Sequence, residues 1–372
     1  MSRLEELREE IDRIDGNIIE LFEKRMQCAK EVAQYKQERG MQVLDSSRER
    51  QVLEQREKLL RNKGLSAYNK RLFLLLMELS RAYQRCFLVL NEGRQVLATN
   101  DMVVFQGEPG ANSQAALVCF FGKDVRMEHY ATFEQVFQAV NSGKAGYGVI
   151  PIENSYTGSI AAVYDLLHTY QLQIVGEQYL KIDHKLLGVP GAKLENVTDV
   201  YSHEQALMQC AGYLKAKQFS QHPYYNTAAS AKFVAETGDK TKAAIASGYA
   251  ARLYGLDILE DDISVSAGNT TRFIIVAKNP YTGENADKVS VCFVLDHQPG
   301  ALANALQFFA QNGLNMVKIE SRPLVDRNFE YMFYVDFAGG AAQKALAGIT
   351  EKNSGVFREF TVLGAYPGGE AE

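Results

Sequence analysis

The first 39 residues carry apolar side chains in steps of three and four, which is the spacing of one face of an α-helix. The apolar positions of this face are Leu4, Leu7, Ile11, Ile14, Ile18, Leu21, Cys28, Val32 and Tyr35. The same spacing predicts an apolar residue at position 25, where the sequence has Arg25. Burying a guanidinium is costly unless an anion meets it. The helix therefore needs either a carboxylate partner from this chain or an anionic ligand.

Helix geometry limits which cations can share one ligand with Arg25. Lys36 follows Arg25 by eleven residues, which places it about 16 Å along the axis and within about 20° of the same face. Arg8 lies seventeen residues before Arg25, about 25 Å away and turned by about 100°. If all three cations serve one pocket, Arg8 must come from a second copy of the chain. The alternative is a coiled-coil seam whose cations reach solvent.

Two further helices carry polar residues that suit such a pocket. Ser46 and Glu49 have the spacing of a capping box, which by itself explains Glu49. Asp45 and Arg48 lie beside it, and the cluster could hold a ligand hydroxyl. A helix predicted at about residues 67–85 carries Ser80 and Gln84 one turn apart. Uncharged donors at this spacing, opposite a cationic helix, suit a polar dianion.

This pattern over about residues 3–86 resembles the all-helical chorismate mutase family. The resemblance implies an intertwined dimer in which Arg8 comes from the partner subunit. It places the residues that bind and convert chorismate at Arg8, Arg25, Lys36, Asp45, Arg48, Glu49, Ser80 and Gln84. The chemistry fits, because a [3,3] rearrangement needs a compact conformer and donors at the ether oxygen, and no nucleophile. The resemblance makes Lys36 and Gln84 those donors.

Length and composition predict a multidomain globular protein of the cytosol. A chain of 372 residues suggests two or three domains, and 46% hydrophobic residues is ordinary for a globular protein. The cysteines show no metal-binding or redox spacing and indicate a reducing compartment; they are Cys28, Cys86, Cys119, Cys210 and Cys292. We expect no signal peptide and no membrane span. A net charge of −5 argues against nucleic acid as a partner.

After a predicted linker at residues 87–101, the pattern changes to alternating strands and helices. Predicted strands near 102–106, 146–152, 197–201 and 243–246 each lead into a turn of small polar residues and a helix. Another helix begins after Asn226 and Thr227. This alternation predicts parallel α/β sheets in two lobes. Backbone N–H groups at such helix starts can bind anions, although the same residues also cap helices for structural reasons alone.

Three segments of this region look like prephenate dehydratase over about residues 102–278: Pro151–Ser155, Asn226–Ser230 and Gly268–Phe273. Alone, the last segment could be a strand start with an exposed arginine. The resemblance implies a two-lobed fold like that of periplasmic binding proteins, with Thr271 as the essential threonine. It also implies substrate-binding roles for Asn154, Ser155, Asn226, Thr227, Ala228, Arg272 and Phe273, to which we add Ser113. The first turn, at 107–113, and Glu204 depart from the family pattern.

The implied reaction removes carbon dioxide and the ring hydroxyl from prephenate and gives phenylpyruvate. Aromatisation drives it, and the barrier lies in expelling hydroxide, so a donor at that oxygen lowers the barrier. Thr271 could supply the hydrogen bond directly or relay a proton through water. Arg272, a bidentate donor that stays charged, is expected to pair with a substrate carboxylate. We expect no metal and no other cofactor.

The last third of the chain predicts a βαββαβ module. Strands are expected at 289–295, 315–320, 329–337 and 356–363, with helices at 300–311 and 341–351, which is the ferredoxin-like order. Pro299–Leu302 and Glu320–Pro323 resemble the two signatures of the ACT regulatory domain, although each alone could be a capped turn or a strand end. The resemblance implies L-phenylalanine bound between paired domains. The expected effector residues are Gly300, Ala301, Leu302, Asn315, Glu320, Ser321 and Arg322.

Together the segments resemble a bifunctional chorismate mutase and prephenate dehydratase of phenylalanine synthesis, inhibited by phenylalanine. The expected domains are residues 1–90, 102–278 and 287–366. We expect a homodimer or higher homo-oligomer that binds small molecules. The alternative is a sensor that binds a carboxylate without turnover and uses the helical segment only as a dimerisation arm.

Overall fold

The computed structural model describes residues 3–37, 46–77, 80, 101–264, 268–280, 285–324, 327, 329–339 and 356–369. The chain forms two compact units, Met1–Arg94 and Gln95–Glu372, and each is described by itself. Among the described residues, no helix combines the length and the apolar run that a bilayer crossing requires.

The N-terminal unit is helical, as predicted. It contains α1 (Arg3–Gln37), α2 (Ser46–Leu59), the short 3-10 helix η1 (Lys63–Leu65) and a further helix over 66–77. Most of the apolar face of α1 is exposed within the single chain: Leu4, Ile11 and Ile18 keep 57%, 55% and 56% of their surface. Burial begins only near Met26 and Ala29. A helix face this apolar is ordinarily buried, so the exposed face of α1 is suited to packing against another apolar surface.

A six-stranded sheet, the first sheet, opens the second unit. Its strand order is β2-β1-β3-β11-β5, with β4 paired to β3. Strands β1, β2 and β3 are parallel, whereas β11 runs antiparallel to both of its neighbours. The strands are β1 (Val103–Gln106), β2 (Met127–Tyr130), β3 (Tyr147–Asn154), β4 (Gly158–Ser159), β5 (Gln173–Lys181) and β11 (Thr270–Ala277).

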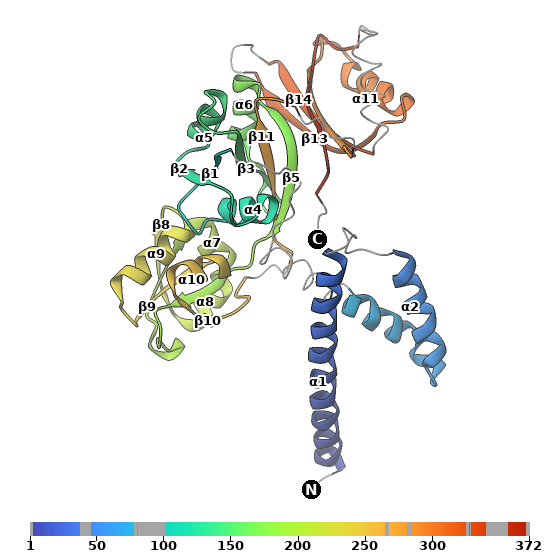
Figure 1. Ribbon diagram of the computed structural model, residues 1–372, viewed down its shortest axis with the longest axis vertical. Helices are drawn as coiled ribbons and strands as arrows, with labels where there is room; N and C mark the ends of the chain where they lie inside the picture. Colours follow the sequence, from blue (N-terminus) through green and yellow to red (C-terminus); the bar gives the residue numbers. More distant parts are fainter. Residues whose placement is uncertain are drawn as a thin grey trace. The chain divides into compact units, whose positions relative to one another are not determined.

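Helices cover both faces of the first sheet (Figure 1). Side chains alternate along β11, so Phe273 and Ile275 pack with α4 (Asn112–Phe121), while Ile274 and Val276 pack with α5 (Phe133–Asn141) and α6 (Ala161–Tyr170). This alternation decides which side chains of β11 can share a site.

A five-stranded sheet, the second sheet, forms the other lobe, in the order β10-β6-β9-β7-β8. Its strands are β6 (Lys185–Gly188), β7 (Asp199–His203), β8 (Ser220–Tyr224), β9 (Lys242–Ala246) and β10 (Asp257–Glu260). Its helices are η2 (Leu194–Asn196), α7 (Glu204–Gln209), α8 (Ala211–Lys217), α9 (Thr227–Thr237) and α10 (Gly248–Tyr254). The two lobes are as predicted, but the prediction of parallel sheets is wrong for β5, β6, β10 and β11. The physical reason is topological: the chain enters the second lobe after β5 and returns as β11 between β3 and β5.

The C-terminal sheet has four antiparallel strands in the order β13-β14-β12-β15, which is the ferredoxin-like order. Its elements are β12 (Lys288–Val294), α11 (Ala301–Gln311), β13 (Asn315–Pro323), β14 (Tyr331–Ala338) and β15 (Glu359–Tyr366). The predicted helix at 341–351 lies outside the described residues.

Both faces of the C-terminal sheet are packed. Phe293 and Phe337 face α11, and Val294 and Tyr366 face the first sheet and α6. The backbones come close here, because a Cβ added to Gly364 would lie 2.0 Å from the carbonyl oxygen of Ile174. The C-terminal sheet is thus built directly onto the first sheet (Figure 1).

Candidate active sites

The end of β3 lies beside the start of β11, and three polar residues meet there: Asn154, Ser155 and Thr271. Thr271 pairs with Asn154 in the strand register, and the Asn154 amide donates to Thr271 Oγ1 at 2.9 Å. The Ser155 hydroxyl donates to the carbonyl of Gly268 at 3.1 Å and accepts from the Thr270 N–H at 2.9 Å. The structure therefore brings the adjacent residues Asn154 and Ser155 next to Thr271, which belongs to a different motif 117 residues from Asn154.

The hydrogen bonds around Asn154 give Thr271 a defined polarity. Asn154 Oδ1 accepts from the backbone N–H groups of Tyr156 and Thr157 at 3.0 and 3.1 Å, so its amide hydrogens point the other way. Because Thr271 Oγ1 accepts one of them, its own proton is left for another acceptor. A hydroxyl held in this way can donate to an oxygen that gains negative charge.

A polar chain continues from this point toward the second lobe, and the sequence analysis missed it. Asn154 donates to Asn269 Oδ1 at 2.6 Å, and Asn269 donates to Gln209 Oε1 at 3.4 Å. His184, between β5 and β6, has its Nε2 at 2.7 Å from the same oxygen and must donate to it. Asn269 lies inside the quoted Gly268–Phe273 motif, but no spacing in the sequence singles out Gln209 or His184.

The remaining predicted substrate residues lie at helix starts or in the core. The Asn226 side chain caps α9 by accepting from the Ala229 N–H at 2.7 Å, and Thr227 and Ala228 form the first turn. Ser113 is buried in the first turn of α4. Phe273 is 1% exposed within the apolar core under α4, so the expectation of a substrate contact there is corrected to a core role.

Arg272 also requires correction. It lies on the opposite face of β11 from Thr271, and its guanidinium donates to Glu177 at 2.7 Å, Asp336 at 2.5 Å and Tyr366 at 3.1 Å. Burial alone would lower the pKa of Arg272, but the carboxylates of Asp336 and Glu177 raise it well above its usual value. Arg272 is thus paired with carboxylates of its own chain rather than open to a substrate carboxylate, because adjacent residues of a strand face opposite sides.

In the N-terminal unit, Arg25 meets Ser80. Its guanidinium donates to the carbonyl of Leu76 at 2.6 Å and to the Ser80 hydroxyl, which itself donates to Leu76 O at 2.8 Å. Within the described part of the chain, Arg25 forms no ion pair with a carboxylate. Burial lowers the pKa of Arg25, and the positive charge of Arg56 lowers it further. A cation with neutral partners and a second cation nearby favours an anionic ligand.

The other predicted mutase residues are only partly described. Arg8 is exposed on α1 and Arg48 is exposed at the start of α2. Asp45, Gln84 and the side chains of Lys36 and Glu49 lie outside the described residues.

The structure divides the predicted effector residues. Gly300, with a φ of 81°, precedes α11, and Ala301 and Leu302 form its first turn. On β13, exposure alternates, so Asn315 and Ser321 are exposed. Glu320 and Arg322 are instead partly buried against β4 and α6, which is a correction to the expected shared site: Glu320 accepts from Ser159 at 2.6 Å, and Arg322 donates twice to Asp165, at 3.2 and 3.0 Å.

Among the described residues, no group of three His, Cys, Asp or Glu side chains is arranged to hold a metal ion. The polar chain from Thr271 to His184 consists of neutral hydrogen-bonding groups. Its chemistry is that of hydrogen-bond donation.

Because of His184, we expect the stability of the folded protein to depend on pH. Burial lowers the pKa of His184, while its hydrogen bond to Gln209 acts in the opposite direction. His184 binds a proton more readily in the unfolded chain than in the folded protein, so protonation favours unfolding. The contribution of neutral His184 to the stability of the fold is therefore present above the ordinary pKa of 6.5 and is lost as the pH falls below it. We expect the midpoint temperature of thermal unfolding to decrease as the pH is lowered from about 7 to about 5, and to decrease less in His184→Gln. His168→Gln, at an exposed position, is the control; equal pH dependence in wild type and His184→Gln would contradict the prediction.

Comparison with known proteins identifies two families along the chain. The family model of chorismate mutase type II matches residues 7–85, and that of prephenate dehydratase matches residues 103–281. The chain therefore combines the helical class of mutase with the two-lobed class of dehydratase.

Relatives of full length carry the same combination. The bifunctional chorismate mutase/prephenate dehydratase of Aquifex aeolicus (strain VF5) is 32% identical over 373 residues, covering 99% of this chain and 98% of the relative. The chain belongs to the bifunctional chorismate mutase/prephenate dehydratase family. The chloroplastic arogenate dehydratase/prephenate dehydratase 1 of Arabidopsis thaliana is 40% identical over 286 residues, 71% of each chain.

A solved structure resembles the second unit. Prephenate dehydratase of Arthrobacter aurescens, in complex with L-Phe, has a TM-score of 0.63 and 30% sequence identity, and the match covers 73% of this chain and 90% of that one.

Proposed function

We propose that the chain converts chorismate to prephenate in its helical unit and prephenate to phenylpyruvate in its α/β lobes, and that L-phenylalanine inhibits the second reaction. The observation that carries the dehydratase assignment is the Thr271 hydroxyl, which accepts from Asn154 and is thereby oriented to donate. We propose domains at residues 1–90, 102–278 and 287–366, the first two corresponding to the family matches. We also propose a reducing, cytoplasmic location, because the cysteine spacings in the sequence match neither a disulfide framework nor a metal-binding motif.

The dehydration step follows from the polarity of this hydroxyl. When the ring carboxylate of prephenate leaves as carbon dioxide, its bonding electrons enter the ring and the C–O bond to the ring hydroxyl breaks. The departing oxygen gains negative charge, accepts a hydrogen bond from Thr271 and takes up a proton to leave as water. Preorganised donors of this kind contribute most where charge develops. The amide groups at the start of α9, in Thr227 and Ala228, are our candidates for binding a substrate carboxylate.

The two-lobed arrangement supports a site in which substrate lies between the lobes, as in periplasmic binding proteins. The chain from Asn154 through Asn269 reaches Gln209 on α7 of the second lobe. Bound substrate would therefore meet polar groups from both lobes.

The mutase assignment depends on a second copy of the chain. The apolar face of α1 is exposed in one chain, and Arg25 holds Ser80 with no carboxylate partner among the described residues. We propose that two copies of α1 pack along this face as an intertwined homodimer. Arg8 of one subunit then reaches the pocket around Arg25 of the other, and the two guanidinium groups bind the two carboxylates of chorismate.

The regulatory assignment rests on the C-terminal sheet. We propose that it is an ACT domain, because its strand order is ferredoxin-like and α11 begins directly after Pro299 and Gly300. The strand β13 is at the edge of the sheet and exposes Val317 and Ile319, which favours pairing with a second copy. L-phenylalanine, which is bound in the similar Arthrobacter aurescens structure, is the proposed effector.

One coupled assay tests the whole proposal. Purified full-length chain is incubated with chorismate, and prephenate and phenylpyruvate are quantified over time with and without L-phenylalanine. We expect both products, and a lower rate of phenylpyruvate formation when phenylalanine is present. A sensor would give no phenylpyruvate above the acid-catalysed background, and an unchanged rate with phenylalanine would refute the regulatory assignment. A parallel incubation with arogenate reports whether that substrate is also accepted.

A further inference from the structure

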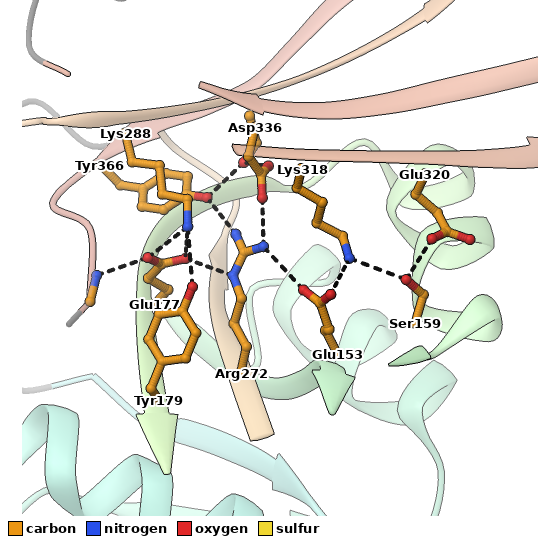
Figure 2. Close-up of polar contacts among 12 residues, drawn as sticks. Glu153, Ser159, Glu177, Tyr179, Arg272, Lys288, Lys318, Glu320, Asp336 and Tyr366 are labelled. Atoms are coloured by element: carbon orange, nitrogen blue, oxygen red, sulfur yellow. Dashed lines mark hydrogen bonds and ion pairs between the residues drawn. The ribbon is translucent and has the colours of Figure 1, made fainter. Parts of the chain in front are cut away.

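A network of charged side chains lies on the face of β3 and β11 opposite the Thr271 hydroxyl. Glu153 directly precedes Asn154, and Arg272 directly follows Thr271. Glu153 and Arg272 pair with each other in the strand register. Since side chains alternate along a strand, both project to the face opposite the hydroxyl of Thr271. Figure 2 shows them pointing toward the C-terminal sheet.

The C-terminal sheet supplies a partner for each of these two residues. Asp336 on β14 accepts from Arg272 at 2.5 Å, and Lys318 on β13 lies 2.7 Å from Glu153. Arg272 and Glu153 are themselves 3.9 Å apart. Each of the two strands of the site is therefore tied to the C-terminal sheet one residue away from its polar group (Figure 2).

The surroundings make this network rigid. The side chains of Arg272, Glu177 and Asp336 keep 4%, 1% and 10% of their surface. Glu177 also accepts from Lys288 Nζ at 2.9 Å, and Ser290 donates to Asp336 at 2.5 Å, so the carboxylates are satisfied on several sides. Buried ion pairs add little net stability but impose one geometry, because breaking a single partner leaves an uncompensated charge.

A β-bulge separates the end of β3 from the rest of its pairing with β11. The register between β3 and β11 shifts between Arg272 and Phe273, so that Ile152 is an extra residue in β3. A bulge of this kind re-aims the residues beyond it. Glu153 and Asn154 lie beyond the bulge, where a short stretch of ladder pairs them with Arg272 and Thr271.

We propose that Asp336 and Lys318 are positioning residues of the dehydratase site, holding Arg272 and Glu153 and thereby fixing the distance between Thr271 and Asn154. The inference rests on the proposed role of Thr271 in dehydration. It assigns the C-terminal sheet a part in basal catalysis, in addition to any effector that it binds. A small displacement of Thr271 would weaken the hydrogen bond that directs its proton outward.

The test uses full-length chain with Asp336→Asn and Lys318→Met, which remove a charge at nearly constant size. We expect kcat for prephenate dehydration to fall about tenfold to a hundredfold, as a small misplacement of catalytic groups does, with KM changed less than about twofold. Chorismate mutase turnover by the same preparations should be unchanged. That activity reports the concentration of folded helical unit, while circular dichroism and thermal unfolding report whether the second unit is folded.

The matched control is Asp165→Asn. It removes the ion pair between α6 and Arg322, which also joins the dehydratase lobe to β13 but does not adjoin the strands of the site. An equal loss of kcat in Asp165→Asn would mean that any weakening of docking slows the enzyme and would overturn the proposal. Unchanged kcat in folded Asp336→Asn and Lys318→Met would overturn it as well.

Two safeguards keep the result interpretable. If Asp336→Asn does not fold, Lys318→Met at the more accessible pair decides the question alone. If wild-type chain shows no dehydratase activity, the proposed function itself fails, and that outcome is distinct from a variant that behaves like an active wild type.

Discussion

We expect Thr271→Ala to lower kcat for prephenate dehydration by a factor of about 100 to 1,000, the usual cost of removing one preorganised donor at a developing oxyanion. The reason is geometric: Asn154 already donates to Thr271 Oγ1, so the hydroxyl proton is the one available to the departing oxygen. Chorismate mutase turnover should not change. Initial rates of phenylpyruvate formation from prephenate measure the effect.

Thr270→Ala is the matched control, because this threonine precedes Thr271 and contributes its backbone N–H to Ser155. We expect it to retain most of the dehydratase rate, and Thr271→Ser, which keeps a hydroxyl, to retain more activity than Thr271→Ala. A Thr271→Ala variant with the wild-type rate would remove Thr271 from the mechanism.

The second large effect is expected in the helical unit. Arg25→Ala should reduce chorismate turnover by about 100-fold or more, because a partly buried cation facing a dianion stabilises both its binding and the charge that develops during rearrangement. Dehydration of added prephenate should be unaffected. Arg13→Ala is the control, since Arg13 is exposed on the same helix and pairs with Glu10. Equal turnover in Arg25→Ala and wild type would refute the mutase assignment.

Mixing two inactive variants tests the contribution of Arg8 across subunits. In a heterodimer of Arg8→Ala with Arg25→Ala, one pocket contains both mutations and the other contains none, provided that Arg8 acts in trans. Random reassembly should then restore roughly a quarter of the wild-type mutase sites. If Arg8 acted within its own subunit, no pocket would be intact and activity would stay absent.

The sequence predicted the architecture well where the signal was local. The interruption of an apolar helix face by Arg25 identified a cation that the structure places against Ser80 without a carboxylate partner in the described residues. The motifs around Asn154 and Thr271 correctly marked two segments 117 residues apart that meet at adjacent strand ends. Four C-terminal strands and one helix were also predicted in the right order.

The sequence predicted poorly what depends on the third dimension. The motif containing Arg272 could not reveal which face of β11 it occupies, and only the position of Asp336, 64 residues away, explains its buried role. The same applies to Glu320 and Arg322, whose partners lie on β4 and α6. Gln209 and His184 carried no recognisable spacing, because their link to Asn269 depends on how the chain crosses between the lobes.

The placement of β11 has a consequence for how the enzyme is made. This strand completes the middle of the first sheet, yet it is synthesised after the entire second lobe, some 90 residues later than β5. On the ribosome, β3 and β5 must therefore wait with open edges until β11 emerges, and such edges invite pairing with other chains. A nascent or truncated chain that stops before Thr270 would lack both the hydroxyl that we propose for catalysis and the strand that closes the sheet. The synthesis of β11 therefore completes the first sheet and the proposed dehydratase site at the same time.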